Sequence, residues 1–206
     1  MYCPAHFQEK DDQAALVKLL ETHPLATIAR ASEGGLVADH IPLFYENNKL
    51  IGHVAKANPL WKTAPDSEIL TIFQGTDAYI SPSWYATKQT THQVVPTWNY
   101  TAIHVYGRLS AILDSQKKLE IVQKLTQRHE KKLPQPWSVQ DAPADYIEKM
   151  LNAIIGIEIS ISSIEAKWKV SQNQPEENQA GLIQHLQSST DEAAMNMAAE
   201  ILSLKN

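Results

Sequence analysis

The chain has 206 residues, 43% of them hydrophobic and 20% charged, which is enough apolar material for one globular domain with a sizeable core. No segment approaches the 18 or so apolar residues of a membrane span, and the N-terminus lacks the basic and apolar segments of an export signal. The net charge of −5 and the single cysteine, Cys3, argue against a nucleic-acid-binding surface and an internal disulfide. We therefore expect a cytoplasmic protein without a membrane anchor.

The N-terminal part of the chain is expected to form a helix followed by strands. Asp11 and Asp12 precede apolar residues that share one helical face over 13–20, which predicts a helix that Pro24 ends. Alternating and β-branched segments then predict strands, and Gly and Asn pairs predict turns. In chain order these are a strand at 25–29, a turn at 33–35, a strand at 36–45, a turn at 47–48, a strand at 50–54, a short helix near 59, and a strand at 68–73 closed by Gly75.

The C-terminal part combines a polar loop, one long strand and further helices. Polar residues dominate 79–93 and predict a loop between strands, and such loops often carry functional residues. Gly107 permits a bend in a long alternating segment, and Asp114 or Ser115 is expected to cap the helix that follows. The remaining elements are a strand at 97–111, a helix to about 132, a connection at 133–143, a helix at 146–151, a strand at 154–161 and a helical segment at 180–204 interrupted near 189–191.

This order of elements predicts the fold class. About six strands in antiparallel order, with helices at the start, middle and end, favour an α+β, mainly β protein built on a β-barrel with peripheral helices. The sequence has no Gly-x-Gly-x-x-Gly motif and no P-loop, so a nucleotide would have to be held in another way. We expect a single domain over 1–206, with a C-terminal helical segment at about 176–206.

Four blocks of the sequence combine polar and aromatic residues where plain core strands would be aliphatic. They are Gly52–Trp61 (GHVAKANPLW), Tyr79–Tyr85 (YISPSWY), Val95–Tyr100 (VPTWNY) and Lys167–Asn173 (KWKVSQN). In this order they resemble the flavin-binding negative transcriptional regulators of the PaiB family, whose fold is similar to the split β-barrel of pyridoxamine-phosphate oxidases. The resemblance covers most of the chain up to Asn173, with Ala166 where the family more often has glycine. It implies a split β-barrel of FMN-binding type, FMN as the cofactor, and a homodimer that holds the cofactor between its subunits.

The first block offers groups that could hold a phosphate. His53, Lys56 and Asn58 supply the cationic and hydrogen-bonding donors that a flavin phosphate needs. Backbone donors at a helix starting near Pro59 would add to Lys56 in holding a dianion. Two alternatives remain open, namely His53 as a strand residue with satisfied hydrogen bonds and Lys56 as a solvated surface lysine.

The last two blocks offer further contacts to a flavin. Trp98 and Asn99 lie where polar and aromatic residues alternate, as at a ligand cleft or a dimer interface, and we expect Asn99 to contact the flavin ring. Lys169, Gln172 and Asn173 provide a cation and amides suited to phosphate or ribityl oxygens. The alternatives are core or interface aromatics in the one block and a solvent-exposed strand end in the other.

Three functions are compatible with the sequence. The first is an FMN-binding homodimer with oxidoreductase-like chemistry, for which no residue names an electron donor or a substrate. The second, implied by the family name, is a flavin-dependent transcriptional regulator, although a single dense basic run at 127–132 supports direct DNA binding only weakly. The third is a haem-binding split-barrel protein with one of the eight histidines as axial ligand. The sequence has neither metal-ligand spacing nor a Gly-x-Ser-x-Gly elbow, so we expect no metal site and no hydrolase.

Overall fold

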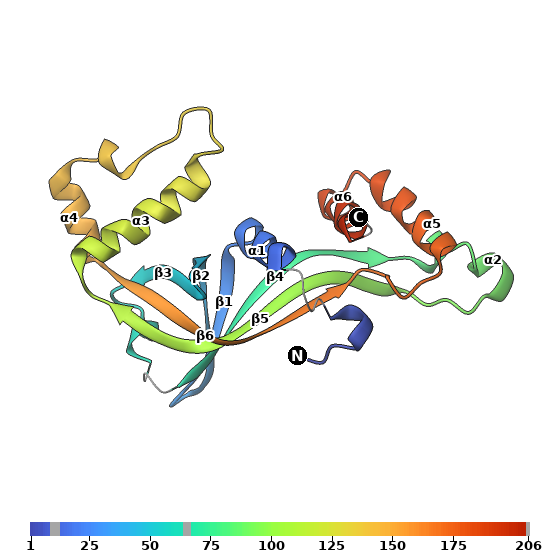
Figure 1. Ribbon diagram of the computed structural model, residues 1–206, viewed down its shortest axis with the longest axis horizontal. Helices are drawn as coiled ribbons and strands as arrows, with labels where there is room; N and C mark the ends of the chain where they lie inside the picture. The colour runs from blue at the N-terminus through green and yellow to red at the C-terminus, as the bar shows by residue number, and fades with distance from the viewer. Residues whose placement is uncertain (9–12, 64–66, 205–206) are drawn as a thin grey trace. The chain divides into compact units, whose positions relative to one another are not determined.

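A barrel of antiparallel strands is the centre of the fold. The computed structural model describes residues 1–8, 13–63 and 67–204, and its elements are labelled in Figure 1. Within these residues six strands close into a barrel in the order β1-β2-β3-β6-β5-β4. The strands are β1 (Leu25–Ser32), β2 (Gly35–Glu46), β3 (Lys49–Ala55), β4 (Glu68–Ile80), β5 (Thr97–Ile112) and β6 (Ile154–Lys169). The barrel confirms the predicted mainly β architecture.

Helices precede, interrupt and follow the strands, as predicted. The α-helices are α1 (Gln13–Thr22), α2 (Lys88–Thr91), α3 (Ser115–Glu130), α4 (Ala144–Asn152), α5 (Glu176–Gln187) and α6 (Glu192–Ser203). Shorter 3₁₀ helices are η1 (Ala5–Phe7), η2 (Pro59–Lys62), η3 (Pro82–Trp84) and η4 (Val139–Asp141). Asp11 and Asp12, which were expected to open the first helix, lie outside the described residues. In the part of the chain that the structure describes, no helix is long and apolar enough to span a membrane.

Two turns and one helix cap form where the sequence predicted them. β1 and β2 pair as a hairpin that closes at Ser32 and Gly35. Between β2 and β3, Asn47 and Asn48 have φ values of 52° and 59°, the left-handed pair that a type I′ hairpin turn requires. The Asp114 carboxylate accepts a hydrogen bond from the Lys117 amide at 2.9 Å and caps α3. Local sequence preferences therefore set these boundaries.

The chain divides into two compact units. Unit 1 comprises Met1–Leu16, Gln74–Ile103 and Glu165–Asn206, and unit 2 comprises Val17–Phe73 and His104–Ile164. β4, β5 and β6 contribute residues to both units. Because the backbone of these strands is continuous through both units, we retain the single domain as a proposal.

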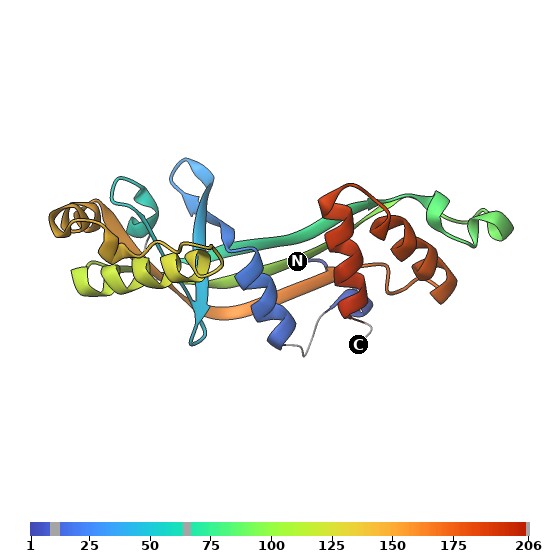
Figure 2. The same cartoon turned by 90° about the horizontal axis from the view of Figure 1, so that it is seen from above.

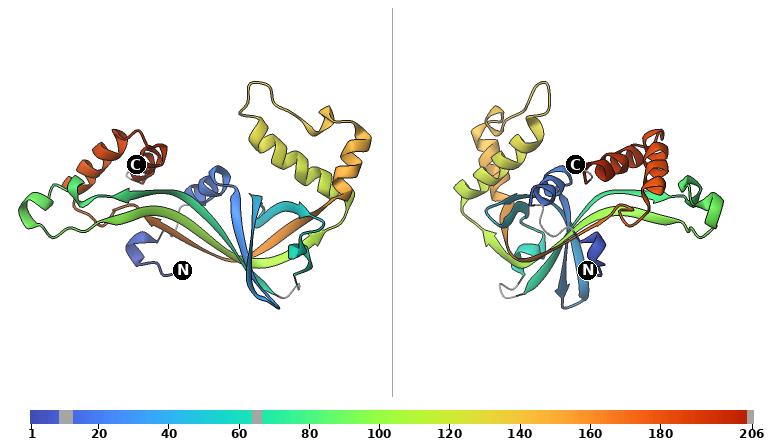
Figure 3. Two further views of the ribbon diagram at one scale, coloured as in Figure 1. Left: turned by 180° about the vertical axis from the view of Figure 1, so that it is seen from behind. Right: turned by 45° about the vertical axis from the view of Figure 1, so that its right-hand side comes forward.

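Unit 2 contains β1, β2 and β3 and part of each remaining strand. Figures 1 and 3 show α3 and α4 on the same side of these strands, and Phe44 of β2 packs in a cluster with Ile121 and Leu125 of α3. A Cβ atom on Gly107 would lie 2.5 Å from the Ser160 carbonyl oxygen, so glycine lets β5 approach β6. The interior is mainly aliphatic and includes Ile28, Leu43, Leu50, Val54, Ile157 and Ile159, together with Phe73.

Unit 1 is built around the end of β6 and the two C-terminal helices. Figure 2 shows α5 and α6 next to each other, and the break between them spans the predicted interruption at 189–191. Trp168 of β6 is buried, and its Nε1 donates to Glu200 Oε1 of α6 at 2.6 Å. Leu182 of α5 and Met197 of α6 are also fully buried. These contacts attach the helical segment to the strand that carries the last sequence block.

Two strands are longer than the sequence analysis predicted. β4 was expected to end at Gly75 but continues to Ile80, since Gly75 keeps a φ outside the left-handed region and buried positions recur up to Ile80. β6 was expected to end near Ile161 but runs on to Lys169, so Lys167 and Lys169 belong to the strand itself. The exposed residues in the middle of β6 are Ser160, Ser162, Ser163 and Glu165, which are more typical of loops than of strands. The predicted loop at 79–93 begins with strand residues and contains η3 and α2.

Candidate functional site

A cavity of about 290 Å³ lies in unit 1 and contains three of the predicted site residues. Thr97 and Asn99 are two apart on β5 and so face the same side of the strand, while Lys169 is the last residue of β6. We call this cavity the Lys169 pocket. Its lining residues are Phe7, Tyr85, Gln93, Val94, Val95, Thr97, Asn99, Lys169, Ser171, Asn173 and Gln174. None of these described residues carries a carboxylate, so the pocket presents positive charge and hydrogen-bonding groups.

Asn99 is the most deeply buried polar group of the Lys169 pocket. Its side chain is 1% exposed, and its Oδ1 accepts a hydrogen bond from Ser171 Oγ at 3.0 Å. Its Nδ2 is buried and has no hydrogen-bond partner within the described ranges. Because a buried amide N–H₂ without a partner is costly, this group suits a ligand that brings an acceptor.

Lys169 supplies the positive charge of the Lys169 pocket. Its Nζ donates to Thr97 Oγ1 and to the Trp98 carbonyl oxygen. The ammonium lies 6.0 Å from the centre of the Tyr100 ring, and that of Lys167 lies 5.1 Å from the same ring. Desolvation lowers the pKa of Lys169, and the Lys167 charge lowers it further. The attraction of an anion placed here would offset both effects.

Two other predicted residues of these blocks do not line the Lys169 pocket. The Trp98 side chain is 54% exposed and packs edge-on against Tyr79, with ring centres 6.0 Å apart. The Gln172 amide accepts from the Val170 N–H at 2.9 Å and donates to the Trp168 carbonyl oxygen. Gln172 thus closes the turn after β6, and its amide is engaged within the chain.

The first sequence block lies in unit 2, where Asn58 has a capping role. Asn58 Oδ1 accepts from the Leu60 amide at 2.8 Å at the start of η2, and its Nδ2 donates to Asp39 Oδ1 at 2.7 Å. The Lys56 side chain is exposed, and its ammonium has no hydrogen-bond or ion-pair partner among the residues described. Of the two, Lys56 therefore keeps its donors for a ligand.

His53 faces an apolar groove of unit 2. The groove has a volume of about 270 Å³ and is lined by side chains such as Leu119 of α3 and Met150 of α4. Burial lowers the pKa of His53, so its ring is neutral at pH 7. Its Nδ1 is buried without a partner in the described part of the chain. A neutral imidazole can donate or accept a hydrogen bond but adds no charge to a phosphate site.

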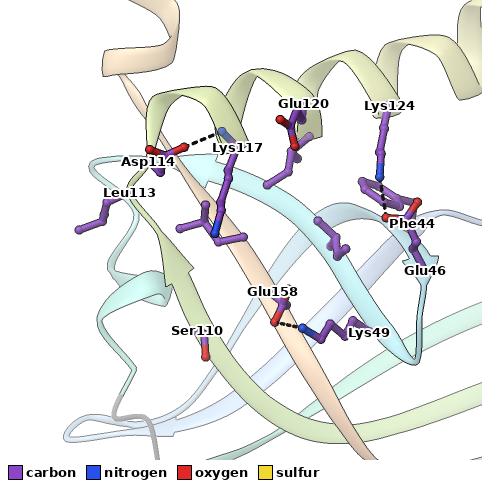
Figure 4. A pocket seen from close by; sticks show the side chains of 13 residues that line it. Phe44, Glu46, Lys49, Ser110, Leu113, Asp114, Lys117, Glu120, Lys124 and Glu158 are labelled. Carbon is purple, nitrogen blue, oxygen red and sulfur yellow. Dashed lines mark hydrogen bonds and ion pairs between the residues drawn. The ribbon is translucent and has the colours of Figure 1, made fainter.

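The sequence analysis did not anticipate a cavity of about 490 Å³ in unit 2 (Figure 4). Its lysines are partly neutralised, because Lys49 pairs with Glu158 at 2.7 Å and Lys124 with Glu46 at 2.6 Å. The lining holds three lysines and four carboxylates, so the cavity is a poor place for a phosphate dianion. The sequence signal for this cavity was the opposite charges on β2, β3, β6 and α3, but such ion pairs are common on solvated surfaces.

Ser171 is a further polar residue of the Lys169 pocket that the sequence analysis did not single out. It lay within the last block as the serine before Gln172, and nothing in its spacing distinguished it. Its φ of +63° is rare for a residue with a side chain, and this property depends on the folded backbone. Thr97 lies within the third block and was likewise not singled out as a site residue.

The barrel, its strand order and its peripheral helices define the class of protein, a split β-barrel of the kind found in flavoproteins. Two of the solved structures that share this fold serve as examples. The flavocytochrome Anf3 from Azotobacter vinelandii matches with a TM-score of 0.59 and 19% identity, over 83% of this chain and 74% of that one. The FAD and haem binding protein from Mycobacterium smegmatis matches with a TM-score of 0.58 and 19% identity, over 83% and 78% of the two chains. At this identity the likeness concerns the fold alone.

The family follows from closer relatives. The family described as "Putative FMN-binding domain" matches residues 1–163. The Bacillus subtilis "Protease synthase and sporulation protein PAI 2" is 32% identical over 206 residues, which cover 96% of this chain and 95% of that protein. The chain belongs to the PaiB-type FMN-binding family, which confirms the resemblance, and its cofactor is FMN.

Proposed function

We propose that this protein is a homodimer that binds FMN at the Lys169 pocket. The observation that carries the proposal is the buried, unpartnered Asn99 Nδ2, which lies in a pocket that contains Lys169 and, among the described residues, no carboxylate. FMN is rich in acceptor oxygens and carries an anionic phosphate, so its chemistry complements these groups. When bound, FMN would supply electron-transfer chemistry, and Asn99, Lys169 and Asn173 would bind and orient it.

The size of the pocket supports the homodimer. Ligand sites usually measure about 300–1,000 Å³, and the Lys169 pocket, at about 290 Å³, has room for only part of a flavin. Tyr79, Val95 and Trp98, all in unit 1, leave large apolar side chains exposed. Exposed apolar groups of this kind often mark an interface, and a second copy of the chain would cover them and enclose the ligand.

Light scattering coupled to absorbance detection tests this proposal in one experiment. We expect light scattering to give a mass of twice the 23.1 kDa of one chain, and the absorbance of the same species to show the bands of oxidised flavin. A stable species at the mass of a single chain would refute the homodimer. A Soret band in place of flavin bands would favour the haem-binding alternative.

We further propose that any role in transcription is indirect and that the protein acts in the cytoplasm. The single cysteine, Cys3, can form no internal disulfide, in keeping with a reduced compartment. The net charge of −5 leaves few clustered cations to neutralise DNA phosphates.

Direct DNA binding is therefore expected to be weak. With promoter and scrambled duplexes at about 150 mM salt, fluorescence anisotropy should give dissociation constants of about 10⁻⁶ M or weaker, with a steep salt dependence. The measurement is repeated with and without FMN. Nanomolar binding that depends on the duplex sequence would make direct regulation the primary function.

A further inference from the structure

We infer that Ser171 is a positioning residue that fixes the Asn99 amide as a hydrogen-bond donor toward an oxygen acceptor of the bound flavin. The inference rests on the FMN site proposed above, and it assigns a role to a residue outside the predicted site. It follows from the backbone of Ser171, from the hydrogen bond between the two side chains, and from the charge of the Lys169 pocket.

The backbone of Ser171 adopts a conformation that serine rarely takes. Its φ is +63°, in the left-handed region that favours glycine and asparagine. The side chain is nevertheless 3% exposed and directed to Asn99, to which its Oγ donates at 3.0 Å. A glycine would fit this backbone with less strain but could not make that bond. The Ser171 hydroxyl therefore makes a contact to Asn99 that glycine could not make at this position.

The hydrogen bond determines which end of the Asn99 amide is free. A carboxamide has one acceptor oxygen and one donor nitrogen. Because Ser171 Oγ–H donates to Oδ1, the Nδ2 group is left as the end without a partner. If the amide were reversed, the Ser171 hydroxyl hydrogen would have no acceptor among the described residues. The observed orientation satisfies both the hydroxyl and the amide oxygen.

The charge of the Lys169 pocket selects the same kind of ligand atom. Lys169 uses two of its three ammonium hydrogens on Thr97 Oγ1 and the Trp98 carbonyl oxygen, which leaves one for a ligand. The free Nδ2 donor of Asn99, the free donor of Lys169 and the positive charge of Lys169 favour an unprotonated oxygen on the ligand over a ligand group that donates a hydrogen bond. In FMN such oxygens occur on the ring carbonyls and on the phosphate, and riboflavin has only the former.

The test compares FMN and riboflavin binding to Ser171→Ala, Ser171→Gly and wild type by quenching of flavin fluorescence. Both variants remove the hydroxyl, so each should weaken binding by about three- to tenfold, the effect of misplacing one neutral hydrogen bond. Loss for both flavins assigns the contact to the part that they share, the ring or the ribityl chain, and loss for FMN alone assigns it to the phosphate. Ser171→Gly also removes the unfavourable φ, so it should melt at a higher temperature than Ser171→Ala while binding no better.

Two controls separate positioning from a general structural effect. Thr87→Val is the matched control, because Thr87 Oγ1 bonds the buried Asn178 amide at 2.9 Å in the same unit but does not line the Lys169 pocket. Its flavin affinities should equal those of wild type. In an Asn99→Ala background, Ser171→Ala should cause no further loss, because Ser171 acts through Asn99.

The outcomes also separate this inference from the proposed function. If wild type binds FMN but the Ser171 variants bind it equally well, or if the losses of Ser171→Ala and Asn99→Ala simply add, the positioning role is refuted while the FMN site remains. If wild type does not bind FMN, the proposed function is refuted first.

Discussion

Replacing Lys56 by alanine is expected to weaken FMN binding by about 1.5–3 kcal/mol, the contribution of a hydrogen bond to a charged group. Riboflavin, which lacks the phosphate, should be almost unaffected. The reason lies in the first sequence block, where Asn58 is engaged by Asp39 and Leu60, and His53 is neutral. Of the three predicted phosphate ligands in this block, only Lys56 therefore carries positive charge with its donors free among the described residues. Lys56 does not line the Lys169 pocket, so in the proposed homodimer it would reach the phosphate from the second subunit.

Parallel fluorescence-quenching titrations with FMN and riboflavin check this prediction. Lys62→Ala is the control, since Lys62 is a nearby exposed lysine of η2 whose ammonium lies 5.4 Å from the Trp61 ring. It should leave both affinities unchanged. Equal losses for the two flavins in Lys56→Ala, or an equal loss of FMN binding in Lys62→Ala, would show that Lys56 does not recognise the phosphate.

Saturating FMN should also stabilise the folded protein. A ligand that binds only the native state, present at about 100 times its dissociation constant, adds roughly 2.7 kcal/mol to the free energy of unfolding. Thermal melts followed by circular dichroism, with and without FMN, measure the resulting increase in Tm. At the same FMN concentration Lys56→Ala should gain less stability than wild type. A midpoint that haem raises and FMN leaves unchanged would overturn the FMN proposal.

Much of the fold could be predicted because it depends on local preferences. The left-handed pair Asn47 and Asn48, the Asp114 cap and the long alternation of β5 are all properties of short segments. The ends of β4 and β6 could not be predicted in this way. Gly75 suggested a strand end, and the alternation of β6 was followed only to Ile161, whereas the barrel keeps both segments extended through pairing with distant strands.

The candidate site was predictable at the level of blocks but less so at the level of single side chains. Asn99, Lys169 and Asn173 do line one pocket, as grouping their blocks suggested. Asn58 and Gln172 have the same donors and acceptors, yet their amides bond within the chain. An amide that caps a turn and an amide that faces a ligand look alike in a sequence, because the difference depends on neighbours that only folding supplies.

The partly buried charge of Lys169 bears on how selection acts on the stability of this protein. Because the pKa of Lys169 is lowered in the folded protein, the unfolded chain binds the ammonium proton more tightly than the folded chain does. The charge of Lys169 therefore opposes folding at neutral pH. This opposition decreases as the pH rises through the pKa of the folded state. The neighbouring oxygens of Thr97 and Trp98 offset part of this cost. Selection for stability alone would favour an uncharged side chain here, and selection for holding an anion would keep the lysine. At position 169, selection for a stable fold and selection for ligand binding therefore favour different side chains.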